Sequence, residues 1–259
     1  MMIKDIFHSI ASAGKRLFAN WAALLISLLL YLALLAALYA FFTIREATMS
    51  QVALNLILPI VAIALFFLIQ AMGLSYVRIG VGAGYLLKRS FKDCWKILLA
   101  SLPLILFAWL IVYLFGKADQ TFFTKSLTAG SKIREWGAIG AHAAQILLLY
   151  VLLPLLAIHL WIATVGEGVV AAFRGFGRSV ARALALRSLL IYLVICAVFG
   201  GMVYFLFFQQ AAFKGAWTQL WAVGIKTALI LLMVFIGWLL TLGSIAELTA
   251  RRAMKELEA

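Results

Sequence analysis

Six uninterrupted apolar runs are the feature of this chain that most limits its fold. A helix of about 20 residues crosses a hydrocarbon core about 30 Å thick, and each run has about that length or more. Because no water reaches the backbone N–H and C=O groups there, each run must satisfy them internally as a helix. The runs are Trp21–Thr43, Val52–Val77, Trp95–Phe115, His142–Val165, Leu189–Phe208 and Trp221–Leu242. We therefore predict an all-α, polytopic membrane protein with six transmembrane helices.

The composition of the chain agrees with a membrane solvent. Hydrophobic residues make up 66% of the sequence and charged residues 12%, against roughly 45–50% and about 25% in soluble domains. Continuous runs do not fit the strands of an outer-membrane barrel, which alternate polar and apolar residues over about 10 positions. The first run exceeds the apolar region of a secretion signal and five further runs follow it, so we expect it to be retained.

Lysine and arginine are unevenly divided between the two sets of connections. With the N-terminus inside, 15 of the 22 Lys and Arg residues lie on the cytoplasmic side and seven on the other. Cytoplasmic loops carry such an excess, so we predict a multi-pass protein of the bacterial cytoplasmic (inner) membrane with both termini in the cytoplasm. The formal net charge of +13 then indicates contact with an anionic membrane surface, and we expect no nucleic acid partner.

A basic amphipathic segment precedes each odd-numbered run. The first segment covers residues 3–20, the second is Tyr85–Leu98 (YLLKRSFKDCWKIL) and the third is Phe173–Leu184 (FRGFGRSVARAL). Apolar residues recur at helical spacing in all three, which is typical of helices that lie in the membrane interface. We expect the three segments to lie on the anionic inner leaflet.

The second and third segments each have an apolar and a polar face. In the second, Phe91 and Trp95 belong to the apolar face, whereas Lys92 and Asp93 belong to the polar face. In the third, the arginines recur every four residues, opposite Phe173. Six basic residues are predicted to contact lipid headgroups: Lys88, Arg89, Lys92, Arg174, Arg178 and Arg182.

Internal similarity indicates a repeated unit. The octapeptides LPIVAIAL (58–65) and LPLLAIHL (153–160) share Leu, Pro, Ala, Ile and Leu in register, and the order of basic segment and run recurs three times. We interpret the chain as one integral membrane domain, 1–259, with repeats 1–83, 84–168 and 169–259. Each repeat is a basic amphipathic helix followed by a transmembrane helix pair.

This layout of basic segments such as Tyr85–Leu98 ahead of paired runs resembles a group of bacterial and archaeal inner-membrane domains of unknown function. In that group basic amphipathic helices alternate with pairs of transmembrane helices, and some members precede glycerophosphodiester phosphodiesterases. The resemblance covers nearly the whole chain and is one of layout, so it implies a fold and no functional residue.

His159 interrupts the match between the octapeptides, because Ala64 stands at its position in the first repeat and Ile236 in the third. A histidine inside a membrane span is a candidate functional residue. It can bond another helix through a group such as Thr164 or Gln70, carry a proton, or ligate a chlorophyll-type pigment or haem. We expect the hydrogen bond, and His159 is the candidate cofactor-binding residue if a pigment is present.

The sequence offers little material for catalysis. It contains nine acidic residues and none of the HExxH, Ser-His-Asp or metal-ligand spacings of common enzyme sites. Glu167 is expected to pair with Arg174 or Arg78 at the cytoplasmic end of a span. We therefore predict that the protein is not an enzyme and has no catalytic residues, no metal site and no required cofactor.

Two classes of function remain. The first is a non-catalytic accessory or structural subunit of a larger membrane complex, or a membrane-organising module, with lipids and other membrane protein subunits as partners. The second is a transporter or lipid-handling protein, favoured by the repeats and by Pro59 and Pro154, which bend spans as in transporter sites. A pigment-binding membrane subunit is a further alternative.

Overall fold

The computed structural model describes residues 2–45, 48–79, 83–128, 132–209 and 215–257. For residues 2–3, 77–79, 119, 122–128, 132–136, 138 and 252–257 it gives the backbone alone. Nearly all described residues are helical, and none of them forms a β-strand. The predicted all-α class is therefore confirmed.

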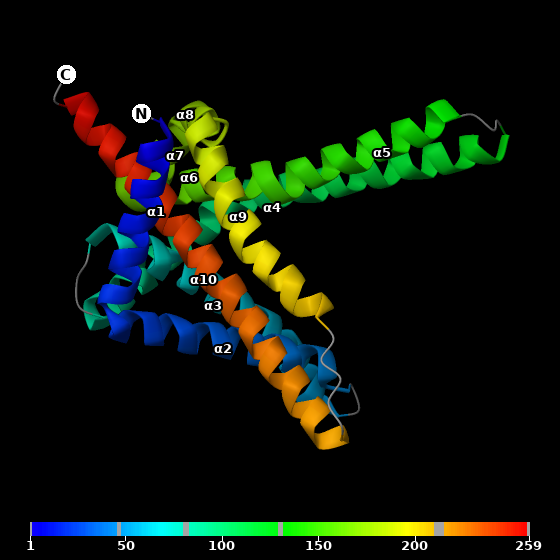
Figure 1. Ribbon diagram of the computed structural model, residues 1–259, viewed down its shortest axis with the longest axis horizontal. Helices are drawn as coiled ribbons and strands as arrows, with labels where there is room; N and C mark the ends of the chain where they lie inside the picture. Colours follow the sequence, from blue (N-terminus) through cyan, green and yellow to red (C-terminus); the bar gives the residue numbers. More distant parts are fainter. Residues whose placement is uncertain (1, 46–47, 80–82, 129–131, 210–214, 258–259) are drawn as a thin grey trace. The chain divides into compact units, whose positions relative to one another are not determined.

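The helices follow one another along the chain with short connections (Figure 1). In order, they are α1 (Met2–Ala19), α2 (Trp21–Thr43), α3 (Met49–Ile79), α4 (Ala83–Thr128), α5 (Lys132–Leu147), the π-helical turn η1 (Leu148–Leu152), α6 (Leu153–Glu167), α7 (Val169–Arg174), α8 (Phe176–Ala183), α9 (Leu186–Phe208) and α10 (Ala216–Leu257).

Six stretches of the described helices are long and apolar enough to cross a membrane. Each of them overlaps one predicted run, so the six predicted spans are confirmed. The stretches are Trp21–Thr43, Met49–Tyr76, Ala83–Ala118, Ile139–Glu167, Leu186–Phe208 and Ala216–Arg251.

The second and third basic segments differ in how they join the following span. The second is continuous with its span in α4, because no glycine interrupts the sequence from Tyr85 to Phe115. The third is broken into α7 and α8, with Gly168 at φ 91° before α7 and Gly175 between the two helices. The predicted stack of three arginines is therefore wrong for Arg174, which lies on α7, whereas Arg178 and Arg182 lie one turn apart on α8.

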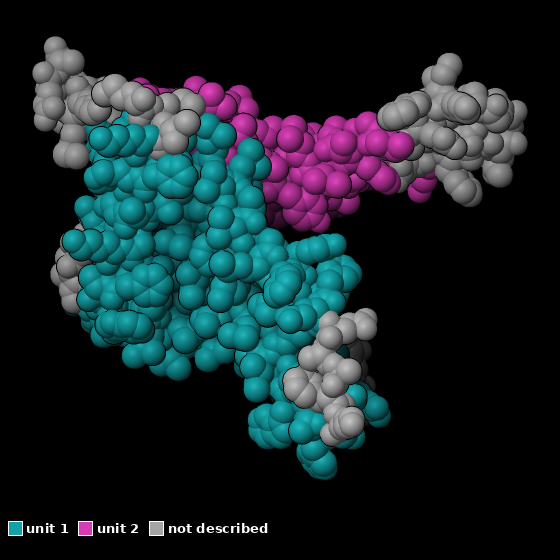
Figure 2. All heavy atoms as spheres, in the orientation of Figure 1, with its two compact units in different colours: residues 1–95, 190–259 teal, residues 96–189 magenta. Residues whose placement is uncertain are grey.

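The chain folds into two compact units (Figure 2). Unit 1 consists of Met1–Trp95 and Leu190–Ala259, and unit 2 of Lys96–Leu189. These boundaries differ from those of the three repeats, which stay a prediction.

The core of unit 1 is built around the C-terminal half of α10. Helices α1 and α3 pack against α10, and α2 packs against α3. The approach of α3 is close because Gly73 has no side chain: a Cβ atom there would lie 3.0 Å from Leu242 and 3.1 Å from Leu239. In this part of α10 Leu242 and Ile245 are completely buried.

Some side chains of helix α1 pack against the rest of unit 1, and others are exposed. Its residues Ile6, Ala13 and Leu17 are buried, whereas Phe7 is 60% exposed. The Tyr76 hydroxyl of α3 donates a hydrogen bond to the backbone carbonyl oxygen of Arg16, 2.9 Å away. Part of the predicted apolar face of the first basic segment is therefore protein core.

Unit 2 is centred on α6, which is contacted by η1, α7 and α8. The indole N–H of Trp161 on α6 donates to the hydroxyl oxygen of Ser101 on α4, at 2.7 Å. In unit 1, Trp238 of α10 donates to the side-chain oxygen of Gln70 on α3, also at 2.7 Å. The two tryptophans thus link neighbouring spans in the same way.

Candidate functional site

His159 is buried in unit 2 and bonded to another helix. Its side chain is 4% exposed, and its Nε2 atom lies 3.1 Å from the hydroxyl oxygen of Ser188, in the first turn of α9. The predicted partners were wrong: Gln70 accepts from Trp238, and the buried Thr164 hydroxyl has no partner among the described residues. The sequence did not reveal Ser188 as the partner, because it lies 29 residues after His159, beyond α7 and α8.

The hydrogen bond to Ser188 bears on the pigment alternative. A metal in a macrocycle binds a histidine through one ring nitrogen. A pigment on Nε2 would have to displace the Ser188 hydroxyl from a side chain that is almost fully enclosed. Cofactor binding by His159 stays a prediction.

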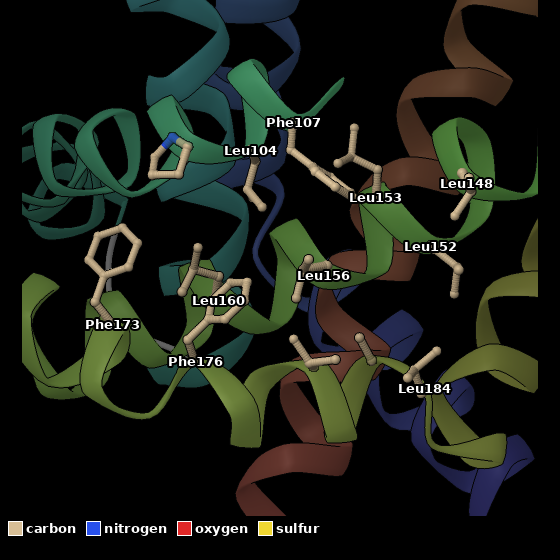
Figure 3. Close-up of a pocket in the computed structure, with 13 residues that line it drawn as sticks. Leu104, Phe107, Leu148, Leu152, Leu153, Leu156, Leu160, Phe173, Phe176 and Leu184 are labelled. Carbon is tan, nitrogen blue, oxygen red and sulfur yellow. The ribbon is translucent and has the colours of Figure 1, made fainter. Parts of the chain in front are cut away.

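An apolar cavity of about 460 Å³ lies beside α6 in unit 2 (Figure 3). Thirteen residues line it, and none has a polar side chain. Helix α4 contributes three of them, including Leu104 and Phe107, while η1 and α6 contribute five, including Leu156. The other five, including Phe176 and Leu184, come from α7, α8 and the residue after α8. Because these residues come from separate parts of the chain, hydropathy alone did not predict the cavity.

A π-helical turn directly before Pro154 contributes to the cavity wall. Pro154 lacks an N–H group and its ring obstructs the carbonyl of the preceding turn. Directly before it, η1 has the wider π-helical hydrogen bonding, in which the Leu153 N–H bonds the Leu148 carbonyl. Leu148 and Leu152 of this turn line the cavity, and Pro103 of α4 lines it from another side. Single π-helical turns inside longer helices are frequent at functional sites.

Helix α8 carries cavity-lining apolar residues and arginines side by side in sequence. Phe176 and Val180 line the cavity, whereas Arg178 is exposed and Arg182 half-buried. Arg174 on α7 is also exposed. The sequence from Val169 to Leu189 contains no acidic residue. The apolar and basic faces predicted for the third segment are therefore present on α8.

The predicted polar face of the second segment needs correction at Asp93. Phe91 is 62% exposed, whereas Asp93, assigned to the polar face, is 4% exposed. Arg89 lies 3.6 Å from Asp93 as an ion pair on the same helix. Lys88 and Lys92 are exposed, and Arg89 is half-buried.

Glu167 forms no ion pair with Arg174, one of its two expected partners. It is exposed at the end of α6 and pairs with no described residue. The side chain of Arg78, one of the two predicted partners, lies outside the described residues. Gly168, which follows Glu167, has a positive φ that ends α6 at this point.

Over the part of the chain that the structure describes, no three His, Cys, Asp or Glu side chains gather closely enough to hold a metal ion. No family model, curated protein or solved structure matches this chain. The resemblance in layout to inner-membrane domains therefore stays a prediction, and the function must be argued from the cavity and its basic surroundings.

Proposed function

We propose that this chain is a non-catalytic integral membrane protein that binds and organises anionic lipids at the inner leaflet of the bacterial cytoplasmic membrane. The observation that carries this proposal is α8, which bears the exposed Arg178 and the half-buried Arg182 as well as Phe176 and Val180, which line an apolar cavity. Each Lys or Arg near an anionic surface contributes about 1 kcal/mol of attraction. Because no acid lies between residues 169 and 189, this attraction is not cancelled locally.

The contacts of unit 1 support a topology with both termini on one side. Arg16 at the end of α1 forms an ion pair with Glu247 near the end of α10, at 3.0 Å. Tyr76, near the end of α3, bonds the same part of α1. These residues therefore share one end of unit 1, as alternate threading of the spans requires. The excess of Lys and Arg in the connections makes that side the cytoplasm in our proposal.

Helix α2 favours a second role, as an accessory or structural subunit of a larger membrane complex. Only 6% of its most apolar stretch is buried within the protein. Leu29 and Tyr39, for example, are 64% and 73% exposed. Such a face has to be covered by lipid or by another membrane protein. A protein that co-purifies in fixed stoichiometry in mild detergent would favour this role.

Hydrogen exchange in defined bilayers tests the lipid-binding proposal. The full chain is placed in nanodiscs of phosphatidylcholine with or without phosphatidylglycerol, and amide exchange is followed over residues 169–189. We expect slower exchange in the anionic discs, and loss of this difference at high salt because exposed charges are then screened.

Matched variants show whether the arginines cause the effect. In R178Q/R182Q the difference between the two kinds of disc should disappear. In Lys226→Gln, which removes a cation that bonds the carbonyls of Phe207 and Gln209, the difference over residues 169–189 should persist. Equal exchange of the natural chain in both discs would contradict lipid binding by this surface.

A further inference from the structure

We propose that the apolar cavity of unit 2 is a binding site for one acyl chain of an anionic phospholipid. This inference rests on the lipid-binding function proposed above. It adds the identity of the ligand and the position of its acyl chain. The acyl chain would lie against Leu104, Leu156 and Phe176, and the phosphate would lie outside the cavity near the arginines of α7 and α8.

The lining of the cavity selects an apolar occupant. All thirteen lining side chains are apolar, so no side-chain hydrogen bond holds a polar group there. A water molecule needs two to four polar partners in a buried site and finds none on these side chains. The volume of about 460 Å³ lies within the roughly 300–1,000 Å³ typical of small-molecule sites, so the cavity is large enough for a ligand.

The membrane around the cavity limits which apolar molecules can reach it. Phe107, Leu148 and Leu153 line the cavity and belong to two of the stretches that are apolar enough to span a membrane. The molecules that reach such a surface are membrane lipids, whose apolar parts are acyl chains. An acyl chain is also flexible enough to follow the irregular part of the wall that Leu148 and Leu152 of η1 form. It would supply the dispersion contacts that an empty cavity lacks.

Charge complementarity selects the headgroup. Arg174, Arg178 and Arg182 follow the cavity-lining residues of α7 and α8 within one or two positions in sequence. No salt bridge links any of them to a described acid. Guanidinium groups bind phosphate through paired, charge-assisted hydrogen bonds. A lipid whose headgroup has a net negative charge is therefore favoured over a zwitterionic one.

The test is native mass spectrometry of the full chain after reconstitution in equimolar phosphatidylglycerol and phosphatidylcholine and extraction in mild detergent. We expect one phosphatidylglycerol retained on the natural chain. Filling the cavity with Leu156→Trp should reduce retention about tenfold. The matched control, Leu147→Trp, adds the same bulk on the same span at a side chain that is 53% exposed and does not line the cavity. Its retention should equal that of the natural chain.

Two further variants distinguish the contribution of the acyl chain to lipid binding from that of the headgroup. Val180→Trp fills the cavity from α8 and should lower lipid retention as Leu156→Trp does. With two cavity-filling variants, the test can still be made if one of them fails to fold. In R178Q/R182Q the preference for phosphatidylglycerol should fall roughly thirtyfold, because two charges near the lipid are lost, while phosphatidylcholine is still retained.

Specific outcomes would overturn the inference. Retention that is unchanged in both folded cavity-filling variants would place the lipid elsewhere, even if the exchange experiment still showed attraction by the arginines. Equal retention of the two lipids by the natural chain would refute the headgroup assignment. Retention of detergent alone, with no phospholipid, would show that the cavity binds apolar molecules without selecting a phospholipid.

Discussion

The guanidinium group of Arg16 lies 3.0 Å from the carboxylate of Glu247 and ties the N-terminal helix to the end of α10. Arg251, one turn further along α10, also lies 3.0 Å from this carboxylate. The Glu247 side chain is 10% exposed, whereas that of Arg16 is 47% exposed. One nearly buried acid is thus shared by two more accessible cations. The charges of this cluster, together with the buried Leu17, hold α1 in place.

Removing this acid should loosen α1 without unfolding the protein. We expect Glu247→Gln to weaken the docking of α1 by about 1 kcal/mol, because half-exposed ion pairs contribute up to about that amount. Amide exchange over residues 4–19 should then rise roughly fivefold, with no change in α9. The control is Glu167→Gln, which removes an exposed carboxylate that forms no ion pair with a described residue. A similar rise in the control would contradict the assigned role of Glu247.

Two glycines of α10 should respond in opposite directions to the same substitution. A Cβ atom at Gly237 would lie 2.9 Å from the Phe199 ring on α9, whereas one at Gly224 would meet nothing within 4 Å. Gly237→Ala should therefore destabilise the protein by about 1–3 kcal/mol through overpacking. Gly224→Ala should be neutral or stabilising by up to about 1 kcal/mol, because alanine favours helix.

Thermal unfolding in one detergent measures both glycine variants. Adding Phe199→Leu to Gly237→Ala should recover part of the loss, since the smaller side chain makes room for the methyl group. Equal melting temperatures for the two single variants would show that α9 and α10 do not approach closely at Gly237.

The six spans were predictable because lipid contact imposes a simple rule on sequence. Any helix surrounded by hydrocarbon must be apolar over about 20 residues, whatever its neighbours are. Leu29 of α2, 64% exposed, and Leu242 of α10, fully buried, meet the same requirement. For this reason hydropathy located both helices and did not distinguish the core helix from the exposed one.

The site was less predictable because amphipathic patterns do not reveal what covers each face. Phe91 was grouped with the apolar face and is 62% exposed, whereas Asp93 is 4% exposed. Both lipid and protein can cover an apolar face, and an ion pair such as Arg89–Asp93 lets an acid be buried. The residues that line the cavity come from helices far apart in sequence, so it emerged only from the fold.

Reporter fusions test the predicted topology. Fusions after Lys88 and Arg182 should behave as cytoplasmic, and fusions near Thr48 and Ser126 as external, because the uneven distribution of Lys and Arg sets the orientation. The measurement pairs a reporter that is active only inside with one that is active only outside. A cytoplasmic signal at Ser126 would contradict the order of the spans.

The final prediction concerns the hydrogen bond between His159 and Ser188. Because Ala64 and Ile236 occupy the matching positions of the other two predicted repeats, the fold should assemble in His159→Ala. A double-mutant cycle with Ser188→Ala isolates the bond, and its coupling should be about 0.6 kcal/mol, the average for one hydrogen bond between membrane helices. No coupling would mean that the contact contributes nothing to stability. The visible spectrum of the same preparations tests the alternative, since a pigment band that is present in the natural chain and lost in His159→Ala would make His159 an axial ligand.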